Sequence, residues 1–412
     1  MVQTDHADPL WPPPAGFVPA PSQIEGIEIY APAPGEEVEE QTRTFKCSFC
    51  GAAIAYSAVE QQLACPHCGR MQAIAAATVG QMATEFEFTL QAMQQARYGW
   101  GGERRELACE SCGAVVAVAP DALTSTCAFC GSHRVLARAA AGDILRPTAL
   151  IPFTVDAQQC HAEVAQWLGR GWMHPAELRH VRELREMAGV YLPFWTFDAH
   201  IQANWRAEVG TERTQRYYEN GEWKTRTVID WRWRSGRVSL SVDDHLVTGT
   251  TRVGRALLNR VTPFDLTGLV EYDAGYLAGW QAKLCDLLLE PAWEIGKEDM
   301  REQARRACYQ DTGSSHVRNF QMTIQFADER WRHILLPVYL ASYHFDQRLF
   351  QVLVNGQTGK VAGQKPVDWL KVWLAIAAML APGACVGLAG LLTAPLGGIG
   401  VVGLVLGLSL IH

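Results

Sequence analysis

The feature that most constrains this chain is a cysteine pattern that occurs twice. Each copy reads Cys-x2-Cys, then 14 residues, then Cys-x2-Cys, and the second copy begins 62 residues after the first. A glycine follows the second cysteine of all four pairs, which permits the positive φ that brings backbone amides close to the sulfurs. The eight cysteines are Cys47, Cys50, Cys65, Cys68, Cys109, Cys112, Cys127 and Cys130.

Four thiolates complete the tetrahedral coordination of Zn²⁺, and a two-residue gap lets one tight turn present two sulfurs to the same ion. We therefore predict two Cys₄ zinc ribbons with one Zn²⁺ each. Both ions would be structural, because a four-sulfur site leaves no open position for catalysis. Separate redox-active pairs are the alternative, but repetition in register favours paired ligation. Free thiolates also indicate a reducing compartment, and the first 21 residues lack the features of a signal peptide.

Composition divides the rest of the chain into further segments. Residues 1–42 hold eight acids, no Lys or Arg, and eight of the 20 prolines, so we expect a disordered, Pro-rich acidic tail. The ribbons occupy residues 43–75 and 105–138. Apolar residues at a spacing of three to four predict a linking helix within 76–104. Residues 143–366 alternate helical patterns with strands rich in Trp, Val and Thr, which predicts an α+β domain with an antiparallel sheet.

A weaker repeat occurs inside the α+β region. Residues 191–195 read Tyr-Leu-Pro-Phe-Trp, and residues 335–339 read Leu-Leu-Pro-Val-Tyr. Each run follows a predicted helix and opens a predicted strand. This echo suggests that the domain consists of two related α+β halves.

The C-terminal segment has the composition of a membrane anchor. Residues 372–411 contain no charged side chain, and the first 21 of them would form a helix of about 32 Å, enough to cross a hydrocarbon core of about 30 Å. Trp369, Lys371 and Trp373 are the aromatic and cationic residues expected at the cytoplasmic interface. We predict a transmembrane helix or helical hairpin over residues 369–411. A buried hairpin of a soluble protein is the alternative.

Two other classes of function find less support. The formal net charge is −7, and a ribbon that binds nucleic acid needs a basic face, so this alternative requires four arginines to converge: Arg104, Arg105, Arg134 and Arg138. No nucleotide-binding loop, nucleophile elbow or His-Glu-x-x-His motif occurs, so we expect no enzymatic activity. A hydrolase would require a pocket that gathers Asp198, His200, Asp243 and His245.

Together these features resemble a family of bacterial zinc-ribbon proteins with a C-terminal membrane anchor. The resemblance covers most of residues 43–380. Beyond the ribbons it rests on the run from Tyr191 to Ala199, on Leu336 to Tyr339, and on Val354 to Lys360. Members often carry names taken from transcription-factor-type zinc ribbons or from the primosomal helicase, but this chain has no helicase nucleotide motif.

The resemblance implies work at the cytoplasmic membrane with phage-shock or band-7-type envelope-stress proteins. We therefore expect a non-enzymatic adaptor in the inner membrane whose soluble domains face the cytosol. Its partners would be the lipid bilayer and a protein. A nucleic-acid-associated factor tethered to the membrane is the second hypothesis. The sequence identifies neither the partner nor the signal.

Overall fold

The computed structural model divides the chain into two compact units, residues 1–43 and 44–412. In the first unit, β1 (Phe17–Ala20) pairs antiparallel with β2 (Ile29–Pro32). Part of the stretch expected to be disordered therefore forms a short ladder, because its aromatic and β-branched residues suit strands. The residues described are 17–20, 29–32, 45–80, 83–89, 99–100, 104–118, 127–130, 132–139, 144–180, 187–346 and 348–393; the rest of the expected tail lies outside them.

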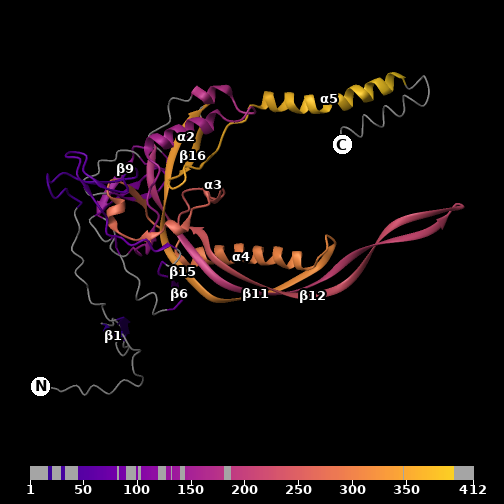
Figure 1. The fold of residues 1–412 in the computed structure, drawn as a ribbon, viewed down its shortest axis with the longest axis horizontal. Helices are drawn as coiled ribbons and strands as arrows, with labels where there is room; N and C mark the ends of the chain where they lie inside the picture. The colour runs from indigo at the N-terminus through magenta and orange to yellow at the C-terminus, as the bar shows by residue number, and fades with distance from the viewer. Residues whose placement is uncertain are drawn as a thin grey trace, which may run out of the picture. The chain divides into compact units, whose positions relative to one another are not determined.

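Three long strands form the centre of the second unit: β11 (Ala188–Glu219), β12 (Glu222–Thr248) and β15 (Val317–Phe345). β11 lies between the other two and pairs antiparallel with both (Figure 1). The expected antiparallel sheet is present, and β structure outweighs helix. Shorter strands extend it: β6 (Phe86–Glu87), β10 (Ala149–Leu150), β13 (Val270–Glu271), β14 (Gln281–Lys283), β16 (Arg348–Asn355) and β17 (Val361–Gly363).

The helices of this unit cover the long strands and their connections. α4 (Leu289–Asp311) presents one apolar face at a spacing of three to four residues, and that face buries Trp293, Met300 and Cys308 against β11. The shorter elements are α2 (Ala157–Gly169), α3 (Arg255–Val261), and the 3₁₀ turns η2 (Ala176–His180), η3 (Leu266–Gly268) and η4 (Ala274–Leu277).

β11 and β15 pair about a point of approximate twofold symmetry. Leu192 lies opposite Leu336, so the two similar runs noted in the sequence are hydrogen-bonded to each other. The neighbouring strands follow the same symmetry, because β10 pairs parallel with β15 and β14 pairs parallel with β11. The element order β10–α2–β11–β12 is repeated as β14–α4–β15–β16. The two parts of the domain thus share one element order and one pattern of strand pairing.

The backbone contacts of one half recur in the other. The Gly249 N–H donates to the Pro193 carbonyl at 2.8 Å, and the Gly249 carbonyl accepts from the N–H groups of Asp286 and Leu287, both at 3.0 Å. The second half makes the same three bonds at the same distances with Gly356, Pro337, Thr154 and Val155. Each glycine thus lies at the end of a strand in one half and is hydrogen-bonded to the loop that leads into the helix of the other half.

Side-chain donors reinforce the same two loops. Trp195 Nε1 donates to the Leu287 carbonyl at 2.9 Å, and Tyr339 Oη donates to the Val155 carbonyl at 2.7 Å. Both acceptors lie two residues before the first residue of a helix, α4 or α2. The aromatic residues at the ends of the two similar runs therefore hold the helices in place.

The two ribbons differ in how they join this core. β3 (Ala55–Ser57), β4 (Gln62–Ala64) and β5 (Met71–Gln72) form a separate three-stranded sheet. The second ribbon instead continues the main sheet, since its strand β8 (Val115–Val118) pairs antiparallel with β14. The sequence predicts a ribbon outside the α+β domain, because no local pattern indicates pairing between strands so far apart in the chain. Its strands are β7 (Arg105–Cys109), β8 (Val115–Val118) and β9 (Val135–Ala139).

About half of residues 76–104, where a linking helix is expected, lies outside the described residues. Within 83–89 the structure has the strand β6 in its place. Phe86 lies opposite Trp331 of β15, and the centroids of the two rings are 4.9 Å apart. This cross-strand aromatic contact explains why the segment is extended there rather than helical.

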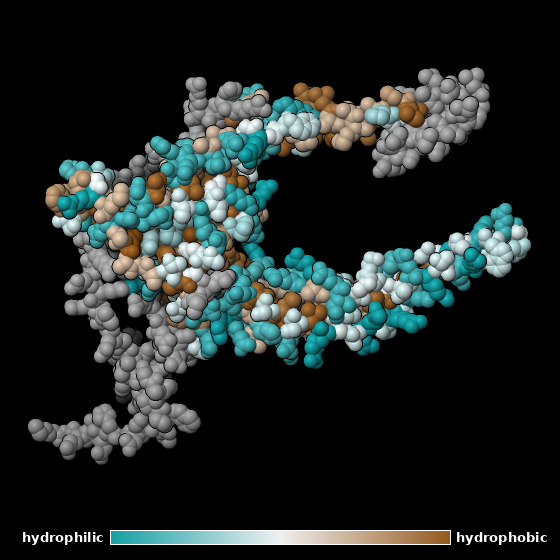
Figure 2. Space-filling view, in the orientation of Figure 1, coloured by the Kyte–Doolittle hydropathy of each residue, from teal (hydrophilic) through white to brown (hydrophobic). Residues whose placement is uncertain are grey.

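α5 (Trp369–Thr393) carries the one helical stretch of the described residues that is long and apolar enough to cross a membrane, Trp369–Val386. Its apolar side chains lie open on the surface (Figure 2). The start of α5 is tied to the second unit, because Lys371 Nζ donates to the His174 carbonyl at 2.8 Å. Trp369 and Trp373 are exposed beside it. The second arm of the expected hairpin lies outside the described residues.

The repeated glycine contact yields a stability prediction. A methyl group at Gly356 would lie 2.6 Å from the Phe153 ring and 2.8 Å from Pro337 Cβ, so Gly356→Ala should destabilise the second unit by about 1–3 kcal/mol. A methyl group at Gly254 would meet nothing within 4 Å, so Gly254→Ala is the matched control. We expect a lower melting temperature for the first variant only; equal melting temperatures would contradict the packing described.

Candidate metal centres

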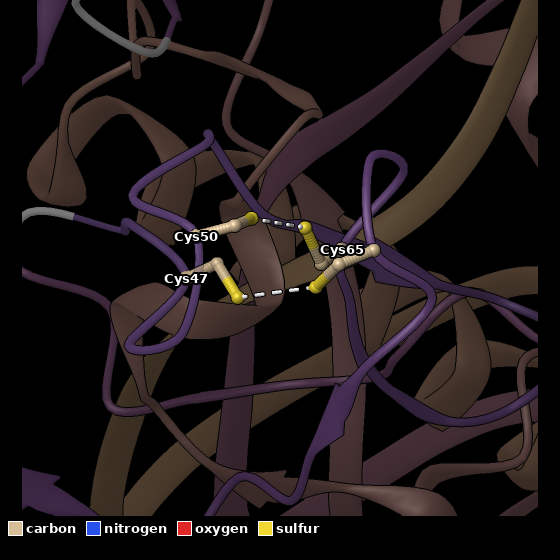
Figure 3. A group of neighbouring side chains, drawn as sticks. Cys47, Cys50 and Cys65 are labelled. Atoms are coloured by element: carbon tan, nitrogen blue, oxygen red, sulfur yellow. Dashed lines mark hydrogen bonds between the residues drawn. The ribbon is translucent and has the colours of Figure 1, made fainter.

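The first cysteine cluster has the dimensions of a four-sulfur metal site. The sulfurs of Cys47 and Cys68 are 3.6 Å apart, those of Cys50 and Cys65 are 3.5 Å apart, and all four lie within 4.8 Å of one another (Figure 3). Tetrahedral Zn²⁺ with Zn–S bonds near 2.3 Å places sulfurs about 3.8 Å apart. A disulfide would require about 2.05 Å. The spacing therefore fits a shared metal ion and excludes disulfides here.

The second cluster repeats this arrangement. The sulfurs of Cys109 and Cys130, and those of Cys112 and Cys127, are each 3.7 Å apart. In both clusters the first cysteine faces the fourth and the second faces the third. The structure thus assembles both predicted ligand sets, and each can hold one metal ion.

Each cysteine pair sits in the same kind of backbone turn. The Cys47 N–H donates to the Ala52 carbonyl at 2.7 Å, and the Gly51 N–H donates to the Cys47 carbonyl at 2.9 Å. Gly51, Gly69 and Gly113 have φ values of 72°, 69° and 69°, as the sequence pattern predicts. A side chain with a Cβ would be strained in this region. The fourth glycine of the pattern lies outside the described residues.

These turns aim backbone dipoles at the sulfurs. The N–H groups of Cys50 and Phe49 lower the pKa of Cys47 to about 6. Burial opposes ionisation of Cys109, but the N–H groups of Cys112 and Ser111 outweigh it and lower its pKa to about 7. Because Zn²⁺ binds the thiolate form, less free energy is needed to deprotonate Cys47 and Cys109 near neutral pH. The Ala52 N–H lowers the pKa of Cys50, but burial and the neighbouring sulfurs outweigh it and raise that pKa, and burial raises the pKa of Cys127.

Aromatic residues of the core hold the first ribbon. The Tyr56 N–H donates to the Ala278 carbonyl, and Trp280 Nε1 donates to the Tyr56 carbonyl, both at 2.9 Å. The Trp280 ring stacks on Phe153 with centroids 4.0 Å apart. The first ribbon is thus bonded to the segment of the core that leads into β14.

The arginines that a nucleic-acid-binding ribbon would need do not form one exposed group. Arg104 is buried and donates to the carbonyls of Ala274 and Trp280. Arg134 is exposed but pairs with Glu110 at 3.0 Å. Arg105 is exposed, and the side chain of Arg138 lies outside the described residues. At least one of the four arginines therefore serves the core rather than a basic face.

The acidic and histidine residues considered for a hydrolase are only partly brought together. A cavity of about 430 Å³ between β12, α3 and α4 is lined by Asp243 and His245, and Asp198 lies close to Asp243. His200 is elsewhere, with Nε2 at 3.0 Å from the Ser239 hydroxyl. His245 Nε2 lies 3.1 Å from the Asp299 carboxylate. The four residues do not form one site.

The groups that surround Asp198 could not be predicted from the sequence. Arg332 is buried on β15, donates to the Thr196 hydroxyl at 3.1 Å and bonds the Asp244 carboxylate. Burial raises the pKa of Asp198 to about 7, with Glu85 acting in the same direction and Arg332 opposing it. Glu85 and Arg332 are far from Asp198 in sequence, so no local pattern connects them.

Comparison with known proteins adds a relative but no function. The chain is 26% identical over 330 residues to the uncharacterized protein YdjG of Bacillus subtilis (strain 168), an alignment that covers 80% of this chain and 92% of that protein. No protein-family model matches, and no solved structure matches.

The two clusters predict the metal content of single-cysteine variants. Cys109→Ser removes one of four sulfur ligands, so the purified chain should retain about one Zn²⁺ instead of two, as measured by elemental analysis. Cys308→Ala is the control, because Cys308 lies on α4, is buried against the long strands, and belongs to neither cluster. Two Zn²⁺ in the Cys109 variant would contradict Cys₄ ligation.

Proposed function

We propose that this protein is a membrane-anchored zinc-ribbon adaptor that binds a protein partner at the cytoplasmic face of the membrane. Two four-cysteine clusters support the zinc part of the proposal, and α5 supports the anchor. The observation that carries the binding role is an exposed two-stranded extension of the main sheet. In this proposal the zinc ions brace the fold and take no part in chemistry.

This extension consists of residues 210–231, which we call the hairpin arm. The pairing of β11 with β15 ends at Val209 and Val317, and β11 and β12 continue together past the end of β15 (Figure 1). Most side chains along the arm are open to solvent on both faces. An isolated two-stranded ribbon is marginally stable in water. A partner that packs on the arm would supply the buried surface it lacks.

Aromatic residues at the end of the arm supply the contact surface. Tyr218 and Trp223 lie opposite each other, are 62% and 72% exposed, and have ring centroids 5.3 Å apart. Aromatic side chains are enriched at the centres of protein–protein interfaces. The pair therefore supports protein recognition at the tip.

The charge of the arm favours a protein over a nucleic acid. Residues 210–231 contain four bases (Arg213, Arg216, Lys224, Arg226) and four acids (Glu212, Glu219, Glu222, Asp230), so the arm has no formal net charge. Binding to a phosphate backbone requires a net positive surface. The nucleic-acid-associated factor remains the second hypothesis.

The proposal also includes the class of protein partner and the side of the membrane on which the soluble domains lie. The resemblance to membrane-anchored zinc-ribbon proteins favours phage-shock or band-7-type proteins as partners. Lys371 at the start of α5 favours a cytosolic location for the preceding residues, since cytoplasmic loops carry the excess of Lys and Arg. Trp369 and Trp373 would then lie at the level of the lipid headgroups.

If α5 anchors the protein in the membrane, charged residues placed within α5 should move the protein from the membrane fraction to the soluble fraction. The double variant Ala375→Arg and Ala378→Arg adds roughly 5–7 kcal/mol to the free energy of membrane insertion, at about 2.5–3.5 kcal/mol per Arg. We expect the wild-type chain in the membrane pellet after alkaline carbonate extraction, and the double variant mainly in the supernatant. Leucine at the same two positions is the control. Wild-type protein in the supernatant would refute the anchor.

The arm predicts a position-specific protein contact. With a photoreactive benzoylphenylalanine in place of Tyr218, irradiation of native cells should join the chain to one protein of the membrane fraction. Adding Trp223→Ser should reduce the yield about tenfold, as expected for loss of an aromatic hot spot.

The same photoreactive residue at Trp172, which is 61% exposed outside the arm, is the control. An adduct that appears equally at both positions, or no adduct at Tyr218, would contradict a docking role. An adduct that nuclease digestion removes would favour the nucleic-acid hypothesis instead.

A further inference from the structure

A β-bulge at the base of the β11–β12 hairpin brings three carboxylates together. Phe197 pairs with His245 and Ala199 pairs with Val242, so the single residue Asp198 faces both Asp243 and Asp244. One carboxylate oxygen from each of the three aspartates lies within 4.8 Å of the others. Bulges redirect side chains in this way and are frequent next to functional sites.

Asp244 supplies an independent sign of a missing partner. Its side chain is only 7% exposed, and one carboxylate oxygen bonds Arg332. The other oxygen, Oδ2, is buried and has no hydrogen-bond partner among the described residues. A buried charged acceptor without a partner is costly, so native structures normally satisfy it with a protein group, a water or an ion.

The charges around this point are also unbalanced. Four carboxylates are involved, because Glu85 lies beside Asp198 and pairs with Arg332 at 3.5 Å and with Arg330 at 3.3 Å. These two arginines offset two of the four negative charges. His245, on the same strand, faces Asp299 of α4. The carboxylates therefore outnumber the arginines that pair with them, and a divalent cation would offset this excess.

The second half of the fold serves as an internal control. In the symmetry that relates the halves, Ser342 and Gln351 correspond to Asp198 and Asp244, and they pair directly without a bulge. Gln351 donates to the Phe129 carbonyl at 3.3 Å. The scaffold therefore builds this strand pair without acids, so the bulge and its three carboxylates are not needed for the fold.

We propose that Asp198, Asp243 and Asp244 form a binding site for a divalent cation of the Ca²⁺ class. Ca²⁺ takes carboxylate oxygens at about 2.3–2.6 Å, so ligands across its sphere lie up to about 5 Å apart, in agreement with the observed spacing. The soft thiolate clusters do not compete for such a hard ion. Binding at the bulge stabilises the base of the hairpin whose far end is the arm. This inference is independent of the proposed adaptor function.

The test is calorimetric titration of the zinc-loaded, full-length chain with CaCl₂. We expect one Ca²⁺ per chain and a higher melting temperature when it is bound. Asp243→Asn removes an exposed ligand and should weaken Ca²⁺ binding roughly tenfold or more. Asp230→Asn is the matched control, since Asp230 is a partly exposed acid of β12 that pairs with Arg213 at 3.3 Å, and it should leave binding unchanged.

Zinc content separates a lost site from a misfolded variant. The Asp243→Asn variant should still hold two Zn²⁺ per chain if it folds correctly. Asp198→Asn removes another proposed ligand and should show the same loss of Ca²⁺ binding. Absence of saturable Ca²⁺ binding in the wild-type chain would overturn the proposal. Binding that Asp243→Asn and Asp198→Asn leave unchanged would overturn it equally.

Discussion

The antiparallel pairing of β11 with β15 is the contact on which the rest of the fold depends. Leu192 and Leu336 lie opposite each other, and each half of the α+β core inserts a short parallel strand beside the long strand of the other. Gly249 and Gly356 each follow the last strand of one half and form hydrogen bonds with the loop that leads into the helix of the other half. Neither half completes its own sheet, so the two must form together, and their shared centre is almost fully buried.

The two ribbons are attached to this core in different ways. The second ribbon continues the main sheet through β8 and β14, whereas the first is held by backbone and Trp280 contacts at Tyr56. A metal ion in either cluster would therefore stabilise strands bonded to the core, not an independent domain. The two halves also differ in one place. The first half has a long hairpin arm and an acidic bulge, while the second has the short strand β16 at the corresponding place.

Local patterns predicted the parts of the structure that depend on local chemistry. The Cys-x2-Cys-x14-Cys-x2-Cys spacing predicted both ligand sets and the positive φ of Gly51, Gly69 and Gly113, because one tight turn determines each pair. The expected helix around Phe86 is a strand in the structure, since its contact with Trp331 depends on a residue far along the chain. The contact between Arg332 and Asp244 could not be predicted for the same reason, since the two residues are far apart in the sequence.

The sequence by itself determined the two four-cysteine clusters and the apolar α5 stretch, because each is encoded by spacing or composition within a short window. Only the tertiary structure decided that the halves complete each other's sheets, that the second ribbon belongs to that sheet, and that three aspartates meet at a bulge. These features depend on strand register, which long-range pairing sets: a shift of one residue turns every side chain to the other face.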